Sequence, residues 1–180
     1  MTGAPGATAA PSPEVRSTVR ALVLDADERL LLQAYLDPTV HRPGGLPHRE
    51  PVWIAPGGGL APAEGAAAGL DRELREETGL VGVAWGPWLW SRTVDLHYQG
   101  RVRRFVEHYR LGRVPASAPP AAPTSLDAHE RGVLLDHRWW PLPELLTTAA
   151  TVYPPRLAER LAAVLAGAAT DTVVDISHEG

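Results

Sequence analysis

The chain has 180 residues, 44% of them hydrophobic and 21% charged, and carries a formal net charge of -4. This length and composition are typical of one globular domain with a sizeable core, and the charge argues against general attraction to nucleic acid or anionic membranes. The chain contains no cysteine, which excludes disulfides, thiolate zinc sites and cysteine nucleophiles and fits a reducing compartment. We therefore expect a cytoplasmic protein that binds neither nucleic acid nor membranes.

The ends of the chain differ in composition from its middle. Residues 1–15 have no basic start and no apolar run, so they predict a disordered leader rather than a secretion signal or membrane anchor. Residues 16–168 are expected to form one domain. Residues 169–180 are expected to be a C-terminal tail.

The first half of the domain predicts strands followed by a helix. Two apolar stretches flank residues 25–28 and indicate two strands joined by a tight turn. Residues 37–51 are rich in proline and form a candidate substrate loop. A short strand at 52–54 leads into a glycine-rich segment and then a helix that extends to Gly79, a plausible C-cap.

The second half predicts two long strands that fold about Gln99 and Gly100. A proline- and alanine-rich connector follows, and then a strand at 133–140 and a short helix from Pro143 to about Thr148. Residues 154–167 have apolar side chains at helical spacing and predict a helix, with two prolines at its start and Gly167 at its end. Strands that alternate with helices predict an α/β fold with a mixed sheet and helices on its faces.

Three glutamates lie on one face of the first helix. Glu73, Glu76 and Glu77 are separated by three and four residues, so their side chains point roughly the same way. A solvated acidic face is the simplest interpretation of such a cluster taken alone. The alternative is that the carboxylates hold hard divalent cations, which prefer oxygen ligands.

The spacing around these acids favours the second interpretation. The pattern begins with a glycine, then five residues, a glutamate, seven residues and the triplet Arg-Glu-aliphatic. After one further residue comes Glu-Glu, and after one more comes Gly-aliphatic. The positions are Gly58, Glu64, Arg72, Glu73, Leu74, Glu76, Glu77, Gly79 and Leu80. Over these 23 residues the chain resembles the Nudix hydrolase signature at every defined position.

The resemblance implies a Nudix-type α/β/α sandwich, with a mixed β-sheet flanked by helices. It also implies a hydrolase that cleaves the diphosphate linkage of a nucleoside diphosphate derivative with Mg2+ or Mn2+. The metal ligands implied are the Gly58 carbonyl and the side chains of Glu73, Glu76 and Glu77. We expect catalytic roles for Arg72, Glu76, Glu77 and Glu130 and a supporting role for Glu64, with Arg72 orienting Glu73 or Glu64.

The base that activates the attacking water is left open by the sequence. Members of the family use either a glutamate of the signature or an acid from a loop before a late strand. Glu130 lies in such a loop, and Glu107 lies in the second long strand. Each could equally be an ordinary surface carboxylate.

The substrate is also left open. The substrate-binding candidates are Arg92, Arg104 and Trp53, because arginines can bind phosphate and a tryptophan can stack on a base. A nucleoside triphosphate, ADP-ribose or a nucleotide sugar is compatible with the signature. The expected partner is a small nucleotide, and the protein could be a monomer or a homodimer. A non-catalytic Nudix domain that binds a nucleotide is the alternative, although such domains usually lose acids that this chain keeps.

Overall fold

The structure is a computed structural model that describes residues 12–115, 123–126 and 128–178. Most of the predicted leader, residues 1–11, and most of the predicted connector, residues 116–122, lie outside the described residues. The elements in chain order are β1 (Glu14–Leu24), β2 (Leu30–Tyr35), β3 (Val52–Ile54), α1 (Ala66–Thr78), β4 (Ala84–Tyr98), β5 (Arg101–Arg113), α2 (Glu130–Val133), β6 (Leu134–Trp140), α3 (Leu142–Thr147), β7 (Thr151–Tyr153), α4 (Leu157–Leu165) and β8 (Val174–Asp175).

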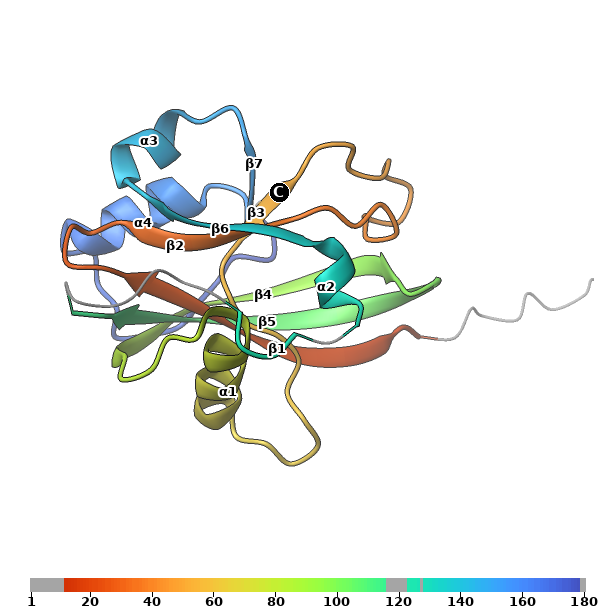
Figure 1. The fold of residues 1–180 in the computed structure, drawn as a ribbon, viewed down its shortest axis with the longest axis horizontal. Helices are drawn as coiled ribbons and strands as arrows, with labels where there is room; N and C mark the ends of the chain where they lie inside the picture. The colour runs from red at the N-terminus through yellow and green to blue at the C-terminus, as the bar shows by residue number, and fades with distance from the viewer. Residues whose placement is uncertain (1–11, 116–122, 127, 179–180) are drawn as a thin grey trace, which may run out of the picture.

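The strands form one mixed, curled sheet in the order β7-β3-β2-β1-β5-β4-β8, with β6 paired to β2 (Figure 1). Strands β4 and β5 are the antiparallel hairpin predicted at Gln99 and Gly100. Strand β1 pairs in parallel with β5 along its whole length but meets β2 only at Leu24 and Leu30. The two halves of the sheet therefore diverge from that point, which leaves one edge of β1 without a neighbouring strand.

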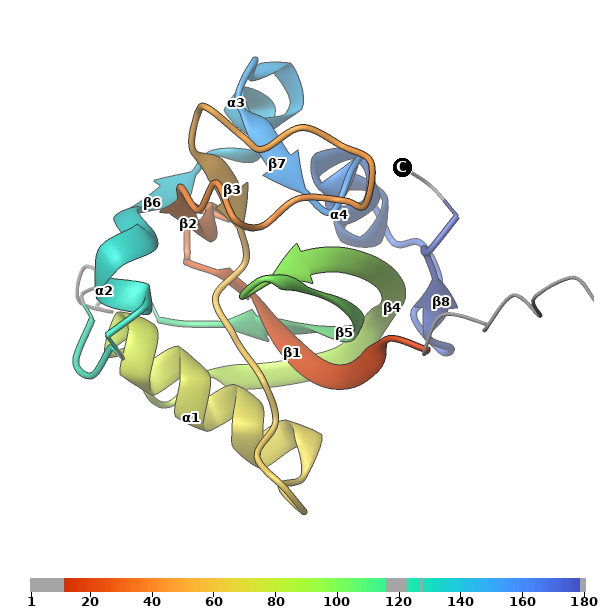
Figure 2. The ribbon, with the colours of Figure 1, turned by 90° about the vertical axis from the view of Figure 1, so that its right-hand side faces the viewer.

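Alternation along β1 explains why helices cover both faces of the sheet. Odd-numbered residues such as Val19 and Val23 pack in one apolar cluster with Leu70 and Leu74 of α1. Even-numbered residues such as Leu22 pack in a second cluster that contains the buried residues of α3 and α4. Figure 2 shows α1 on one side of the strands and α3 and α4 on the other. The predicted α/β fold, with a mixed sheet flanked by helices, is confirmed.

The C-terminal segment differs from the prediction of a tail. Residues 174–175 form β8, which pairs with β4, and the Ile176 side chain is only 2% exposed in the core. Likewise, β1 begins at Glu14, two residues before the predicted start of the domain. No helix in the described ranges is both long and apolar enough to cross a membrane.

Candidate metal and substrate site

The glycine-rich segment before α1 lies along the free edge of β1. The Val19 N–H donates to the Gly58 carbonyl at 3.0 Å, and the Ala21 N–H donates to the Pro56 carbonyl at 2.8 Å. The Leu60 N–H in turn donates to the Ser17 carbonyl at 3.0 Å. The segment thus satisfies backbone groups that the divergence of β1 and β2 would leave unpaired.

Gly57 is the position in this segment that most requires glycine. Its φ is 134°, and a Cβ there would lie 2.0 Å from the Val19 carbonyl oxygen. Its N–H donates to Glu77 Oε2 at 2.7 Å, and its carbonyl accepts a hydrogen bond from Arg20 Nη1 at 2.6 Å. Gly57 therefore connects β1 to the acidic turn of α1.

Replacing Gly57 with alanine is expected to destabilise the protein by about 3 kcal/mol or more, because positive φ and a backbone clash act together. Urea unfolding measures the loss. The matched control is Gly44→Ala, since Gly44 also has positive φ, of 76°, but has open space around its Cα. We expect the control to cost about 1 kcal/mol. Equal losses in the two variants would contradict the close packing of Gly57 on β1.

Helix α1 holds two of the predicted acids in a buried position. Leu70 and Leu74 anchor the helix in the core, and Gly79 ends it with a φ of 71°, as predicted for a C-cap. The side chains of Glu73 and Glu77 are nearly inaccessible, with residue exposures of 8% and 3%. These acids do not form the solvated face that is the simplest interpretation of the sequence.

A third carboxylate joins them from α2. Oxygen atoms of Glu73, Glu77 and Glu130 all lie within 4.8 Å of one another. Glu130 is half-buried and comes from an element far along the chain, so the cluster depends on the tertiary fold. Three carboxylate oxygens at such a separation suit a hard divalent cation, which takes oxygen ligands.

Glu76 lies outside this group of three. Its side chain accepts a hydrogen bond from Arg72 Nη1 at 3.1 Å, and the same guanidinium donates to Glu73 Oε1 at 2.9 Å. Arg72 also contacts both carboxylate oxygens of Glu64, at 2.9 and 2.8 Å. These hydrogen bonds, together with one from the Ala61 N–H, lower the pKa of Glu64 to about 2. Glu64, Glu73 and Glu76 are therefore arranged around one arginine, which orients Glu73 from the side.

Burial makes the charged form of the Glu73 and Glu77 carboxylates energetically unfavourable. Desolvation raises the pKa of Glu77 to about 7, against the opposing effects of the Gly57 N–H and Arg20. Desolvation likewise raises the pKa of Glu73. The Tyr35 hydroxyl donates to Glu77 Oε1 at 3.0 Å. Burial is the main cause that raises the pKa of this phenol, and the negative charge of Glu77 is the second. A divalent cation would compensate the buried negative charge, so the donor set fits the ion that the signature implies.

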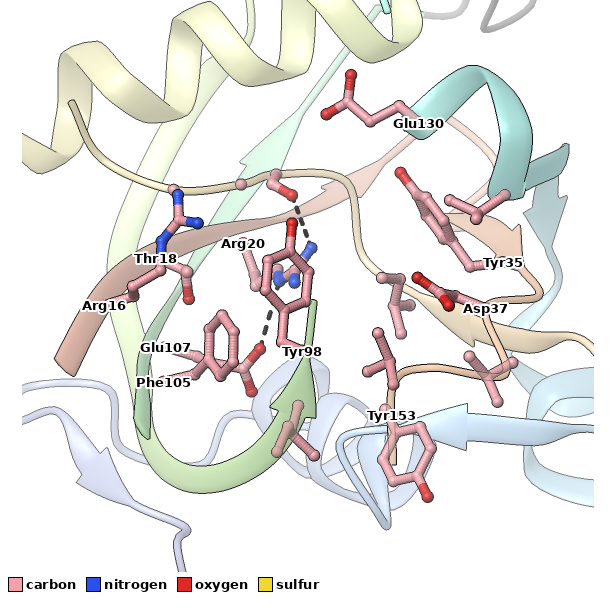
Figure 3. A pocket seen from close by; sticks show the side chains of 18 of the residues that line it. Arg16, Thr18, Arg20, Tyr35, Asp37, Tyr98, Phe105, Glu107, Glu130 and Tyr153 are labelled. Carbon is pink, nitrogen blue, oxygen red and sulfur yellow. Dashed lines mark hydrogen bonds and ion pairs between the residues drawn. The ribbon is translucent and has the colours of Figure 1, made fainter. Parts of the chain in front are cut away.

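A pocket of about 380 Å³ opens beside the acids (Figure 3). Glu73, Glu77 and Glu130 line it together with the glycines at 57–59 and even-numbered residues of β1. The pocket is also lined by the aromatic side chains of Tyr98, Phe105 and Tyr153. The pocket is large enough for a small organic ligand and combines apolar walls with a few charged groups.

Glu107 lines the pocket but is held by three neighbours. Its Oε2 accepts from Arg92 Nη1 at 3.1 Å and from the Tyr109 hydroxyl at 2.8 Å, and its Oε1 lies 3.5 Å from Arg20 Nε. Arg92, a predicted substrate ligand, therefore lies at the pocket but is already paired with an acid. These bonds hold the Glu107 side chain in place at the pocket wall.

Of three other predicted site residues, Gly58 lines the pocket, whereas Arg104 and Trp53 do not. The Gly58 carbonyl accepts the Val19 N–H described above, while its Cα lies so close to Glu73 that a Cβ would be 2.6 Å from the carboxylate carbon. Arg104 lies outside the pocket and pairs with Asp95 at 2.8 Å. Trp53 also lies outside it, because strand alternation points Trp53 towards Trp140 in the core. For Arg104 and Trp53 the structure therefore gives no support to substrate binding.

Residues that the sequence prediction missed lie mainly on β1. Arg16, Thr18 and Arg20 all line the pocket, and each is two residues from the next. The available signal was three polar residues at strand spacing directly before an apolar run. Tyr35, at the end of β2, also lines the pocket and gave no such signal.

Comparisons with known proteins bear on the family and the fold of the chain. The family model described as the NUDIX domain matches residues 14–161. A search of curated proteins gave no match. A MutT protein from Methanosarcina mazei is 18% identical, with a TM-score of 0.56 over 85% of this chain and 94% of that one.

Two further solved structures share the fold. An Ap4A hydrolase from C. elegans is 16% identical, with a TM-score of 0.58 over 85% of this chain and 99% of that one. An ADP-ribose pyrophosphatase from Streptococcus suis is 15% identical, with a TM-score of 0.51 over 89% of this chain and 98% of that one. At these identities the likeness concerns the fold, whereas the domain model covers most of the sequence. The chain therefore belongs to the Nudix family, whose enzymes hydrolyse phosphorus-containing anhydrides.

Proposed function

We propose that this protein hydrolyses the diphosphate linkage of a nucleoside diphosphate derivative, with Mg2+ or Mn2+ held by Glu73, Glu77 and Glu130. The observation that carries the proposal is the convergence of these three carboxylates, within 4.8 Å of one another, at the wall of a pocket. Glu73 and Glu77 are buried. The single positive charge of Arg72 is shared among Glu64, Glu73 and Glu76, so negative charge is in excess here. A divalent ion satisfies that excess of negative charge.

The residues divide the chemistry among them. A bound divalent cation supplies positive charge to the phosphoryl oxygens and makes a water easier to deprotonate. Glu73 and Glu77 provide ligand oxygens from a rigid helix, and Arg72 fixes the orientation of Glu73. We assign the base to Glu130 as well: one of its carboxylate oxygens would serve the metal, and the other would remove a proton from the water that attacks phosphorus. Glu76 acts through its bond to Arg72 and is therefore a positioning residue.

The substrate class rests on the shape and lining of the pocket. Its volume and aromatic side chains suit a nucleoside, and the acids at one wall suit a metal-bound diphosphate. Two of the structural neighbours are named for different nucleotide substrates, Ap4A and ADP-ribose, in keeping with diphosphate cleavage as their common element. The proposal therefore covers nucleoside triphosphates, ADP-ribose and nucleotide sugars as one class.

A nucleotide panel tests the proposal. The purified protein is incubated with nucleoside and deoxynucleoside triphosphates, ADP-ribose, nucleotide sugars and dinucleoside polyphosphates, with Mg2+, with Mn2+ or with a chelator. Chromatography then measures the release of nucleoside monophosphate. We expect turnover of at least one compound with metal and none with the chelator. Binding of a nucleotide without turnover of any compound would favour the alternative of a non-catalytic nucleotide-binding domain.

A further inference from the structure

The pocket face of β1 carries polar side chains that have no part in the proposed catalysis. Arg16, Thr18 and Arg20 alternate along the strand and so point to the same side, before Leu22 continues that face into the core. Figure 3 shows Arg16 and Thr18 next to each other, beside the glycine-rich segment. This row lies at the pocket wall formed by β1 and by residues 57–59.

Thr18 offers an unused hydrogen-bonding group. The residue is only 3% exposed, and its Oγ1 has no hydrogen-bond partner within the part of the chain that the structure describes. A buried hydroxyl without a partner is energetically unfavourable. Such a group at a pocket wall is a donor for a ligand that enters the pocket.

Arg16 offers a positive charge at the same place. Its guanidinium lies 6.0 Å from the centre of the Tyr98 ring and so close to Gly59 that a Cβ there would be 2.6 Å from Nη2. Among the described residues no carboxylate forms an ion pair with Arg16, whereas Arg20 and Arg92 both pair with Glu107. The charge of Arg16 is therefore available to an anion.

The backbone places these two groups next to the acidic cluster. Thr18 forms a β-bridge with Gly59. The preceding glycine, Gly58, packs against the carboxylate of Glu73, as described above. Gly59 therefore lies beside Arg16 and Thr18, and its neighbour Gly58 lies beside the proposed metal ligand Glu73. The two phosphoryl groups of a diphosphate are adjacent, so their binding requires two neighbouring sites of this kind.

We propose that Arg16 and Thr18 form an anion subsite for the phosphoryl group adjacent to the one held by the metal. A guanidinium provides two parallel N–H donors to phosphate oxygens, and the hydroxyl adds a third donor. The inference rests on the proposed function, because its ligand is the second phosphoryl group of the diphosphate. It assigns Arg16 and Thr18 to substrate binding and gives them no part in the proton transfer.

Binding of inorganic pyrophosphate in the presence of Mg2+ tests the subsite, with titration calorimetry as the measurement. Arg16→Gln is expected to raise the dissociation constant about tenfold or more, and Arg16→Lys is expected to restore part of the affinity. Arg113→Gln is the matched control, since Arg113 is an exposed arginine of β5 that lies 3.5 Å from Glu28, outside the pocket. The control is expected to bind pyrophosphate like the wild type.

Thr18→Val separates ligand binding from a structural role. Because the hydroxyl has no partner in the described structure, its replacement by a methyl group should leave the melting temperature unchanged or raise it. The same variant should bind pyrophosphate about threefold or more weakly. For a cleaved nucleotide, KM should rise in the Arg16 and Thr18 variants while kcat changes little.

The outcomes distinguish this inference from the proposed function. Arg16→Gln and Thr18→Val proteins that bind pyrophosphate like the wild type would overturn the subsite, and so would a wild-type protein that does not bind it. A wild-type protein that binds pyrophosphate through these residues but cleaves no nucleotide would support the subsite and contradict the proposed hydrolysis.

Discussion

Replacing Glu77 with glutamine is expected to lower kcat/KM by at least about 100-fold while the protein stays folded. The amide keeps a group that accepts from the Gly57 N–H and a group that faces the Tyr35 hydroxyl, but it loses the charge that holds a cation. Steady-state kinetics on a substrate found with the nucleotide panel measures the loss, and thermal unfolding checks the fold.

Glu159→Gln is the control for this variant. Glu159 also lies on a helix, α4, but is exposed and outside the pocket. Its substitution should change neither activity nor the melting temperature noticeably. A Glu77→Gln protein that retains full activity would require the reaction to proceed without this carboxylate, and the catalytic role of the cluster would have to be abandoned.

Replacing Glu130 with glutamine is expected to lower kcat by about 100-fold or more, because a positioned base contributes about 10²–10⁴ to the rate. KM should change less than kcat, since the nucleotide would still contact β1 and a cation held by the α1 acids. If Glu130 removes the proton, the variant should recover part of its rate as the pH rises, because hydroxide replaces the missing base. The measurement is the pH dependence of kcat for both proteins.

Glu144→Gln serves as the control for Glu130. Glu144 lies on α3, where it pairs with Arg138 at 2.7 Å, outside the pocket. A Glu130→Gln protein with the wild-type kcat would exclude Glu130 as the base and return that role to an acid of α1. Loss of activity that higher pH does not relieve would instead indicate that Glu130 serves as a ligand alone.

The parts of the fold that were predicted are those whose pattern is local. Leu70 and Leu74, one turn apart, identified the buried face of α1, and Gly79 identified its end. The hairpin at Gln99 and Gly100 followed from turn residues between two long predicted strands. Strands β7 and β8, of three and two residues, were not predicted. Their pairing partners lie far away along the chain.

The site was predicted only where one helix contains it. Spacing brought Glu73, Glu76 and Glu77 to one face, but it could not tell that Glu76 turns to Arg72 while Glu130 takes its place beside the other two. That exchange depends on where α2 lies in the tertiary structure. Similarly, Arg16 became a candidate only because the divergence of β1 and β2 exposes the pocket face of β1.

Crystals grown with Mn2+ and measured near the manganese absorption edge would locate the metal ion in the protein. We expect an anomalous difference peak within coordination distance of carboxylate oxygens of Glu73, Glu77 and Glu130, and its loss in the Glu77→Gln protein. A peak only elsewhere on the molecule, or no peak at a Mn2+ concentration that supports full hydrolysis, would contradict the assignment of this carboxylate cluster as the metal centre.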